Sequence, residues 1–423
     1  MQKNMKYILI LFITGFSASI PTIRLHAQNV SSPYSILGIG DVDTKDFGRY
    51  FSSGDASLAR RDPSSYNFSN PASLTSLPYK VVNFDISTRG RASSFLVPGQ
   101  DTTTSITKDF VVKRISLAFK PFAKTAMAFG LKPFSSVNYQ YQANKSILDG
   151  NNYYTENVNG SGGINQIYFS VGRTLGKKIS AGLTASWLFG SLINTTEYTG
   201  NTIDIGITRT QTNFYKGGML QAGLQYYSSP GKKWQHKLGL TVSAGTNLFG
   251  QLQTDYSQND SIKVSNTAND QNFKLPVTIG LGYSATSPGN LTFSADVNYY
   301  DWPYQLVNYQ NSYTDPSVKF SVGMDYSKKM TNMNGPYEKY YLGAGLSMEN
   351  SYIRINNNYL WDYSFSLGGG YNISRALTMY GGFEVGQRGQ ESLGQIRENY
   401  TQFVIGFSLK DIWIGPKVGK KYE

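Results

Sequence analysis

The chain has 423 residues, of which 40% are hydrophobic and only 16% are charged. This length allows two or three ordinary domains or one large barrel, and the scarcity of charge excludes a coiled coil or an acidic disordered chain. The absence of cysteine excludes a disulfide scaffold and thiolate metal sites, and two histidines are too few for imidazole metal clusters. The net charge is +12, but the basic residues are scattered, whereas a nucleic-acid protein gathers them on one face with stacking aromatics.

The first residues have the pattern of an export signal. Lys3 and Lys6 precede the apolar run 7–16, which is too short to cross a bilayer as a helix, and Ala27 offers a small residue for cleavage. We therefore predict a signal peptide over residues 1–27, with an N-terminal anchor helix as the alternative. Removal of Lys3, Lys6 and Arg24 with the signal peptide lowers the net charge from +12 to +9. No later segment approaches 18 continuous apolar residues, which excludes membrane-spanning helices.

Beyond residue 80, apolar and small polar residues alternate with a period of two. Ile179, Leu183 and Trp187, for example, alternate with Ser180 and Thr184. Successive side chains of a strand point to opposite faces, so each segment has one apolar face and one small, polar face.

Fourteen segments show this pattern, and most have nine to thirteen residues or more. A strand tilted through a bilayer needs about 9–11 residues, whereas strands of globular proteins average about 5–6. The segments lie near 80–90, 108–119, 125–143, 163–174, 178–190, 211–227, 237–250, 273–285, 290–302, 317–327, 338–348, 359–372, 376–387 and 398–410.

The connections between these segments alternate between short turns and long polar loops. This alternation is typical of an outer-membrane β-barrel with both termini on the periplasmic side, whereas a soluble propeller or sandwich has shorter strands. The short turns lie at 120–124, 175–177, 228–235, 287–289 and 373–375, with 328–337 the loosest. The predicted long loops are 91–107, 144–162, 191–210, 251–272, 303–316, 349–358 and 388–397.

In a closed barrel of this kind the apolar face meets lipid and the polar face lines the lumen. Three carboxylates within the strands are therefore expected to face the lumen and to pair there with lysine or arginine: Asp296, Asp325 and Glu384. Aromatic residues near the strand ends favour girdles at the membrane interface, although tyrosine also has ordinary strand propensity. They are Tyr226, Tyr227, Tyr299, Tyr300, Trp302, Tyr340, Tyr341, Tyr359 and Trp361.

Residues 28–79 lack sustained alternation and have no core of their own. We predict that they form an N-terminal hatch, or plug, inside the lumen, with a periplasmic tail or linker as the alternative. Asp55 is the expected N-cap of a short helix that ends near Arg61. The barrel then covers residues 80–410, and residues 411–423 are a periplasmic C-terminal extension unless the last strand is misplaced.

A short motif before the first strand resembles the N-terminal hatch motif of the FadL/TodX family of outer-membrane transport proteins. The stretch 62–74 reads Asp-Pro-Ser-Ser-Tyr-Asn-Phe-Ser-Asn-Pro-Ala-Ser-Leu, and Ser73 replaces the glycine of the family motif. The residues that carry the motif are Asp62, Asn70, Pro71 and Ala72. The stretch Ser32-Pro-Tyr-Ser also resembles the start of the mature chain in many Bacteroidota outer-membrane proteins. The secretion-system protein PorV is a similar case.

The resemblance implies a hatch inside a fourteen-stranded barrel and passive uptake of hydrophobic small molecules such as long-chain fatty acids. Many family members release ligand through a lateral opening beside a kinked strand. Pro133 and Pro276 are the candidate strand irregularities here, because proline removes a ladder donor, although each could merely start or bulge a strand. The ligand-binding residues are not identifiable from the sequence.

Two functions follow from the sequence, and neither is enzymatic. The first is a transport barrel; the second is a PorV-like accessory barrel that binds a periplasmic or secretion-system partner and carries no solute. A continuous apolar tunnel beside the hatch would favour the first, and a lumen sealed by side chains the second. His236 has no catalytic partner nearby and is expected at the periplasmic rim, and Gly368–Gly370 lies inside a strand. We expect no metal, cofactor or nucleic acid, and we place the chain in the outer membrane of a Gram-negative bacterium, in contact with lipid.

Overall fold

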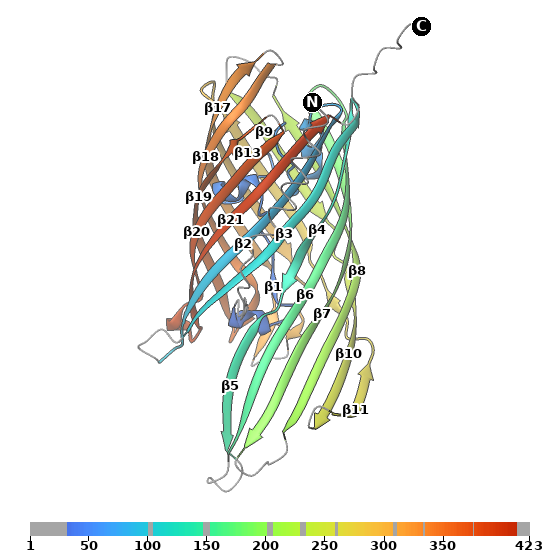
Figure 1. Ribbon diagram of the computed structural model, residues 1–423, viewed down its shortest axis with the longest axis vertical. Coiled ribbons are helices and arrows are strands. Elements are labelled where there is room, and N and C mark those ends of the chain that lie inside the picture. Colours follow the sequence, from blue (N-terminus) through green and yellow to red (C-terminus); the bar gives the residue numbers. More distant parts are fainter. Residues whose placement is uncertain are drawn as a thin grey trace, which may run out of the picture.

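The structure, a computed structural model, is a closed antiparallel β-barrel (Figure 1). Among the described residues, fourteen strands follow one another around the wall, and the pairing of β2 (Val81–Leu96) with β21 (Arg397–Ile412) closes it. The predicted fold class and strand number are thereby confirmed. The structure describes residues 32–99, 105–146, 153–200, 206–228, 234–258, 261–307, 311–332, 335–374 and 376–412.

The fourteen predicted segments all correspond to wall strands, nine of which are continuous. Besides β2 and β21, these are β3 (Ser105–Phe122), β6 (Tyr153–Thr174), β7 (Ile179–Gly200), β8 (Ile207–Tyr227), β18 (Gly335–Ile355), β19 (Asn358–Asn372) and β20 (Leu377–Arg388). The interrupted positions hold β4 (Thr125–Ser136) with β5 (Tyr139–Ser146), β9 (Gln235–Ser243) with β10 (Asn247–Gln258), β11 (Ser261–Ala268) with β12 (Phe273–Lys274) and β13 (Val277–Thr286), β14 (Leu291–Asp301) with β15 (Leu306–Val307), and β16 (Ser312–Thr314) with β17 (Ser317–Asn332).

The two faces of the wall differ as the alternation predicts. On β7, Ser180 and Thr184 are buried, whereas Leu183 and Trp187 are 65% and 53% exposed on the outer surface. In an outer-membrane barrel this apolar outer surface lies against lipid. The described residues include no helix that is both long and apolar enough to span a membrane.

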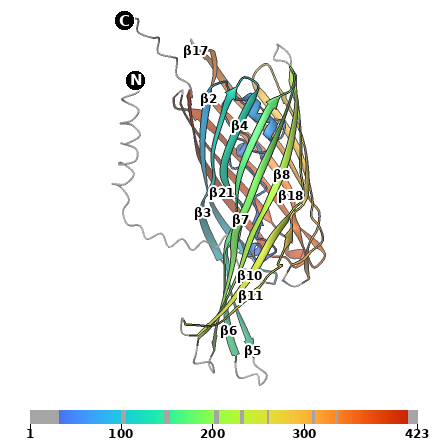
Figure 2. The same cartoon turned by 90° about the vertical axis from the view of Figure 1, so that its right-hand side faces the viewer.

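Three of the predicted loops are largely strand. Segments 144–162, 191–210 and 251–272 carry all of β11, much of β6, β7 and β10, and the start of β8, since threonine and tyrosine among the polar residues favour extended backbone. With β5, these strands run past the rim of the wall as an open sheet (Figures 1 and 2). We call this the sheet extension; it consists of residues 139–146, 153–160, 194–200, 207–213, 252–258 and 261–268. The predicted loop 349–358 also shrinks, to a tight turn at Asn356 and Asn357 between β18 and β19.

Residues 32–79, which we call the inner segment, run through the interior of the barrel (Figure 1). They form η1 (Pro33–Ile36), β1 (Asp41–Val42), η2 (Arg49–Ser53) and η3 (Pro71–Ser76); η4 (Glu391–Leu393) lies in a wall loop. Tyr50, Phe51 and Ala56 are at most 2% exposed. The expected helix from Asp55 to Arg61 is wrong. Asp55 adopts φ 65°, and its carboxylate accepts the Asp46 N–H and contacts a wall lysine instead of capping a helix.

The predicted signal peptide lies outside the described residues, as does most of the C-terminal extension. The last strand, β21, reaches Ile412, so its placement in the sequence is correct to within two residues. The domain boundaries at residues 28–79, 80–410 and 411–423 stay predictions.

Candidate functional site in the barrel lumen

The inner segment is tied to the wall by buried ion pairs. They join it to β3, β17, β18 and β20, so the contacts are distributed around the lumen rather than along one strand. The N···O distances lie between 2.5 and 2.8 Å for Asp43–Lys113, Lys45–Glu384, Asp46–Arg114, Arg49–Glu338, Asp55–Lys319 and Arg60–Asp325. Because removal of one partner leaves a buried charge without compensation, each such pair resists withdrawal of the segment from the wall.

A β-bulge supplies two of these cations from adjacent positions. The β2–β3 register pairs Ser87 with Arg114 and Thr88 with Val112, which leaves Lys113 without a partner opposite it. Both Lys113 and Arg114 therefore face the lumen, where a regular strand would turn one of them towards lipid. The signal in the sequence is a pair of adjacent charges inside an apolar alternation, which period-two analysis did not detect.

The three predicted luminal carboxylates are all buried on the inner face. Asp325 pairs with Arg60, and Glu384 pairs with Lys45, so each carboxylate has an arginine or lysine partner as predicted. Both cations belong to the inner segment. Asp296 has a different role. One of its carboxylate oxygens accepts the backbone N–H groups of Ser57 and Leu58 at 2.5 and 2.8 Å and so fixes the course of the inner segment against β14.

Two of the four motif residues organise the inner segment itself. The Asp62 carboxylate contacts the Arg49 side chain at 2.9 Å and accepts the Ser64 N–H at 2.7 Å. Burial opposes its charge, but Arg49 and Ser64 outweigh burial and lower the pKa of Asp62 to about 2. Asn70 caps η3 by accepting the Ala72 N–H, and its amide donates to the Leu58 carbonyl at 3.0 Å.

Pro71 and Ala72 lie directly against the wall at a glycine. A Cβ built on Gly182 of β7 would come within 2.5 Å of the Pro71 carbonyl carbon and 2.7 Å of the Ala72 nitrogen. Only a residue without a side chain allows the two backbones to approach so closely. Asn70, Pro71 and Ala72 thus lie beside β7 and β8, near the short turn that precedes β7. Asp62 is joined to the same helix, η3, because the Ser76 hydroxyl donates to the Asp62 carbonyl at 2.9 Å.

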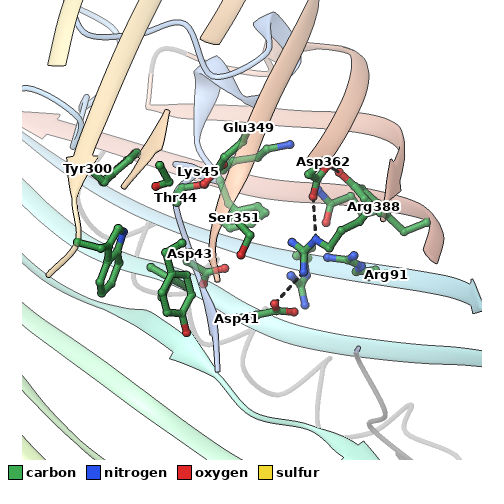
Figure 3. A pocket seen from close by; sticks show the side chains of 18 residues that line it. Asp41, Asp43, Thr44, Lys45, Arg91, Tyr300, Glu349, Ser351, Asp362 and Arg388 are labelled. Atoms are coloured by element: carbon green, nitrogen blue, oxygen red, sulfur yellow. Dashed lines mark hydrogen bonds and ion pairs between the residues drawn. The ribbon is translucent and has the colours of Figure 1, made fainter. Parts of the chain in front are cut away.

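Two small cavities flank the stretch 42–45 of the inner segment. One, of about 90 Å³, is polar: Arg388 lies between Asp41 and Asp362, with N···O distances of 2.7 and 3.1 Å, and Arg91 projects beside it (Figure 3). The other, of about 160 Å³, is lined by apolar residues such as Phe68, Phe134, Met219 and Trp302, and also by charged ones. Neither is a continuous apolar tunnel.

The half of the lumen opposite the short turns is filled by a hydrophobic cluster. Tyr34, Leu37 and Ile39 of the inner segment pack there against wall residues such as Leu188 and Leu248, and all five are at most 7% exposed. Side chains of the inner segment and the wall are therefore packed together in this part of the lumen.

The two predicted prolines both lie where the pairing of the wall is irregular. Pro133 lies where the β4–β6 register shifts, and Pro276 separates β12 from β13. Near Pro133 the wall has a seam. β4 pairs with β3 only between Leu131 and Thr125, and β1 of the inner segment then pairs with β4 at Ser135 and Ser136. Among the described residues, no strand pairs with that edge of β3 from residue 105 to 114.

The aromatic pairs divide between the two faces of the wall. Tyr226 and Tyr299 are 42% and 40% exposed on the outer surface, as girdle residues should be, but Tyr341 is buried against Arg49. Tyr300 and Trp302 line the cavities. The prediction that both members of each pair belong to a girdle is wrong, because adjacent residues of a strand face opposite sides.

The remaining candidates do not form a reactive group. His236 is exposed at the start of β9, where its Nδ1 lies 2.7 Å from the Tyr283 hydroxyl. Gly368–Gly370 lies within β19. In the described part of the chain, no cluster of three or more His, Cys, Asp or Glu side chains is arranged to hold a metal ion.

Sequence comparison assigns the family. Residues 4–418 match the family model described as BamG. The chain belongs to the BamG family. No curated protein matches its sequence.

Solved structures share the fold at low identity. A FadL homologue from Pseudomonas aeruginosa has a TM-score of 0.60 and 12% identity over 89% of this chain and 100% of its own. The toluene transporter TodX from Pseudomonas putida has a TM-score of 0.58 and 15% identity over 89% and 100%. TbuX, a toluene transporter from Ralstonia pickettii, has a TM-score of 0.58 and 15% identity over 85% and 97%. This BamG-family chain is therefore an outer-membrane β-barrel with the FadL/TodX fold, as its motif and strand count predicted.

Proposed function

We propose that this BamG-family protein is a partner-binding outer-membrane barrel whose lumen stays closed. The observation that carries the proposal is the attachment of the inner segment. Buried ion pairs hold it to four wall strands, and a hydrophobic cluster fills the outer half of the lumen. A segment built to move aside would have fewer contacts whose rupture leaves a buried charge. In this account the inner segment is the predicted hatch, but it acts as a permanent plug.

With the lumen closed, activity resides on the outer surfaces of the barrel. The sheet extension is one such surface outside the lipid-facing wall, and it projects from the end opposite the short turns (Figure 2). Outer-membrane barrels have their short turns in the periplasm, so the extension faces the cell exterior. The partner would bind there or at the periplasmic rim.

The test compares complex formation with solute uptake. Outer membranes are extracted with a mild detergent, and the barrel is followed on native gels in parallel with the purified protein. We expect the extracted barrel to migrate in a larger complex, and cells without the gene to take up labelled palmitate and labelled toluene at the wild-type rate. Extraction as a lone barrel together with loss of either uptake would refute the proposal.

A second candidate, uptake of a small hydrophobic solute, is favoured by the seam between β3 and β4 and by the fold shared with toluene transporters. The larger cavity has about the volume that holds benzene, about 160 Å³ against about 150 Å³, and its lining includes Phe68, Phe134 and Trp302 besides charged residues. A long-chain fatty acid would require displacement of the inner segment. Toluene uptake that depends on the gene while palmitate uptake does not would support this candidate.

A further inference from the structure

The two faces of the sheet extension differ in composition. The face that continues the lumen wall carries the tyrosines and most of the aliphatic residues, among polar ones such as Asn194, Gln211 and Thr254. The face that continues the outer surface carries mainly threonine, asparagine, glutamine and serine, with Glu197 and Asp255. On the first face lie Tyr139, Tyr141, Tyr154, Val158, Tyr198, Ile207, Leu252, Tyr256 and Val264. We call it the tyrosine face. Its opposite carries Gln140, Gln142, Asn157, Thr195, Thr210, Gln253 and Ser265.

Ring and hydrogen-bond contacts confirm that these tyrosines share one face. The rings of Tyr139 and Tyr141 lie 6.4 Å apart, and those of Tyr154 and Tyr198 lie 6.2 Å apart. The Asn194 amide donates to the Tyr139 hydroxyl at 2.6 Å. Strands of the extension are therefore linked across the sheet on this side.

Much of the tyrosine face remains exposed. Tyr141, Ile207, Tyr256 and Val264 are 41%, 40%, 40% and 50% exposed. An apolar sheet face is stable when another layer covers it. At its base the face does find such a layer, because Tyr139 and Val158 belong to the buried cluster that packs against the inner segment. Further from the wall, no described residue of this chain covers it in that way.

The composition and size of the face indicate a protein as the missing layer. Tyrosine and arginine are enriched at the cores of protein interfaces, and tyrosine supplies contact area with little loss of conformational entropy. Six strands of about eight residues cover about 26 by 24 Å, or about 600 Å², which approaches the ~800 Å² that one partner contributes to a standard interface.

The charges on the face are few and largely engaged. Among its described side chains, Lys145 pairs with Glu156 at 2.9 Å, and Arg209 lies within 3.4 Å of the Thr196 hydroxyl. A partner with an uncharged contact surface would fit, whereas a strongly acidic or basic one would find no complement.

We propose that the tyrosine face docks a cell-surface protein through an uncharged contact surface, as a second layer on the sheet extension. This proposal rests on the proposed partner-binding function and specifies where the partner sits.

The test places a photo-crosslinking residue, p-benzoylphenylalanine, at neighbouring positions that face opposite ways. Positions 141 and 264 lie on the tyrosine face, and their chain neighbours 142 and 265 lie on the opposite face. We expect irradiation of intact cells to give one protein adduct of the same mass from positions 141 and 264 and none from 142 and 265. Three results would overturn the proposal. A protease-resistant adduct would indicate a polysaccharide, and an adduct of twice the barrel mass would indicate a second copy. Adducts at all four positions would show that the contact is not confined to the tyrosine face.

A substitution series provides the second readout. The double variant Tyr141→Ser/Tyr256→Ser should reduce the amount of the native complex at least tenfold, whereas Gln142→Ser/Gln253→Ser on the opposite face should leave it unchanged. Both variants must retain the heat-modifiable migration of a folded barrel on denaturing gels. If the wild type forms a complex that the tyrosine variant leaves intact, the docking proposal fails while the partner-binding function stands. If the wild type forms no complex, both fail.

Discussion

Replacement of Arg114 by alanine removes the guanidinium that joins β3, β2 and the inner segment. Arg114 is 1% exposed and makes four hydrogen bonds of 2.6–3.0 Å, two to Asp46 and two to Asp85. The Tyr380 hydroxyl also donates to Asp85 at 2.8 Å and would keep part of that carboxylate satisfied. Rupture of a buried ion pair by loss of one partner costs about 3–5 kcal/mol. We therefore expect Arg114→Ala to lower the free energy of unfolding by about 4 kcal/mol.

Urea unfolding in detergent micelles, followed by tryptophan fluorescence, measures this loss. The matched control is Lys145→Ala, which breaks an ion pair whose lysine is 53% exposed and should change stability by less than about 1 kcal/mol. The triple variant Arg114→Leu/Asp46→Asn/Asp85→Asn removes the charges together and should recover most of the loss. Equal stability of Arg114→Ala and Lys145→Ala would refute the claim that buried charges fasten the inner segment.

Three further changes probe the contacts of the inner segment. The pKa of Asp62 is lowered from 3.8 to about 2, so its charged form stabilises the fold above pH 4, and about 2 kcal/mol should be lost as the pH falls from 4 to 2; unfolding curves of Asp62→Asn should show a smaller pH dependence. Gly182→Ala would press a methyl group against η3 and should cost about 1–3 kcal/mol, whereas Gly218→Ala, whose Cβ would meet only the Ser186 carbonyl at 3.8 Å, should be neutral in the same assay. Asp296→Ala leaves the buried N–H groups of Ser57 and Leu58 without an acceptor, which should lower the free energy of unfolding by about 1–3 kcal/mol for each group. Hydrogen exchange at Ser57 and Leu58 should accelerate, and unchanged exchange would contradict the assigned role.

The wall was predictable because membrane strands carry a simple alternation. Every predicted segment corresponds to a wall strand, and Asp296, Asp325 and Glu384 face the lumen as expected. Most of the sheet extension was missed because many residues on both of its faces are polar, so overall polarity suggested loops; only residues 139–143 and 211–213 lay within predicted strands. Period two was still present in the missed part, as in the run 252–257, where Leu252 and Tyr256 lie on one face and Gln253 and Asp255 on the other.

The luminal contacts were not predictable from spacing. Lys113 and Arg114 face the same way only because of a bulge, which the sequence marks merely as two adjacent charges. Asp55 reads as a helix cap, but its carboxylate meets Lys319, more than 260 positions away. Such pairings depend on how an irregular segment lies in the lumen, which no local pattern determines.

A reversible lock on the inner segment tests the central claim most directly. β1 pairs with β4 at Val42 and Ser135, and facing residues of an antiparallel pair lie within disulfide distance. Because the chain has no native cysteine, the variant Val42→Cys/Ser135→Cys would form a single defined bridge. With the lumen permanently closed, the oxidised and reduced forms should support the same native complex and the same uptake of labelled toluene. Loss of uptake or of the complex on oxidation, with recovery on reduction, would contradict the account.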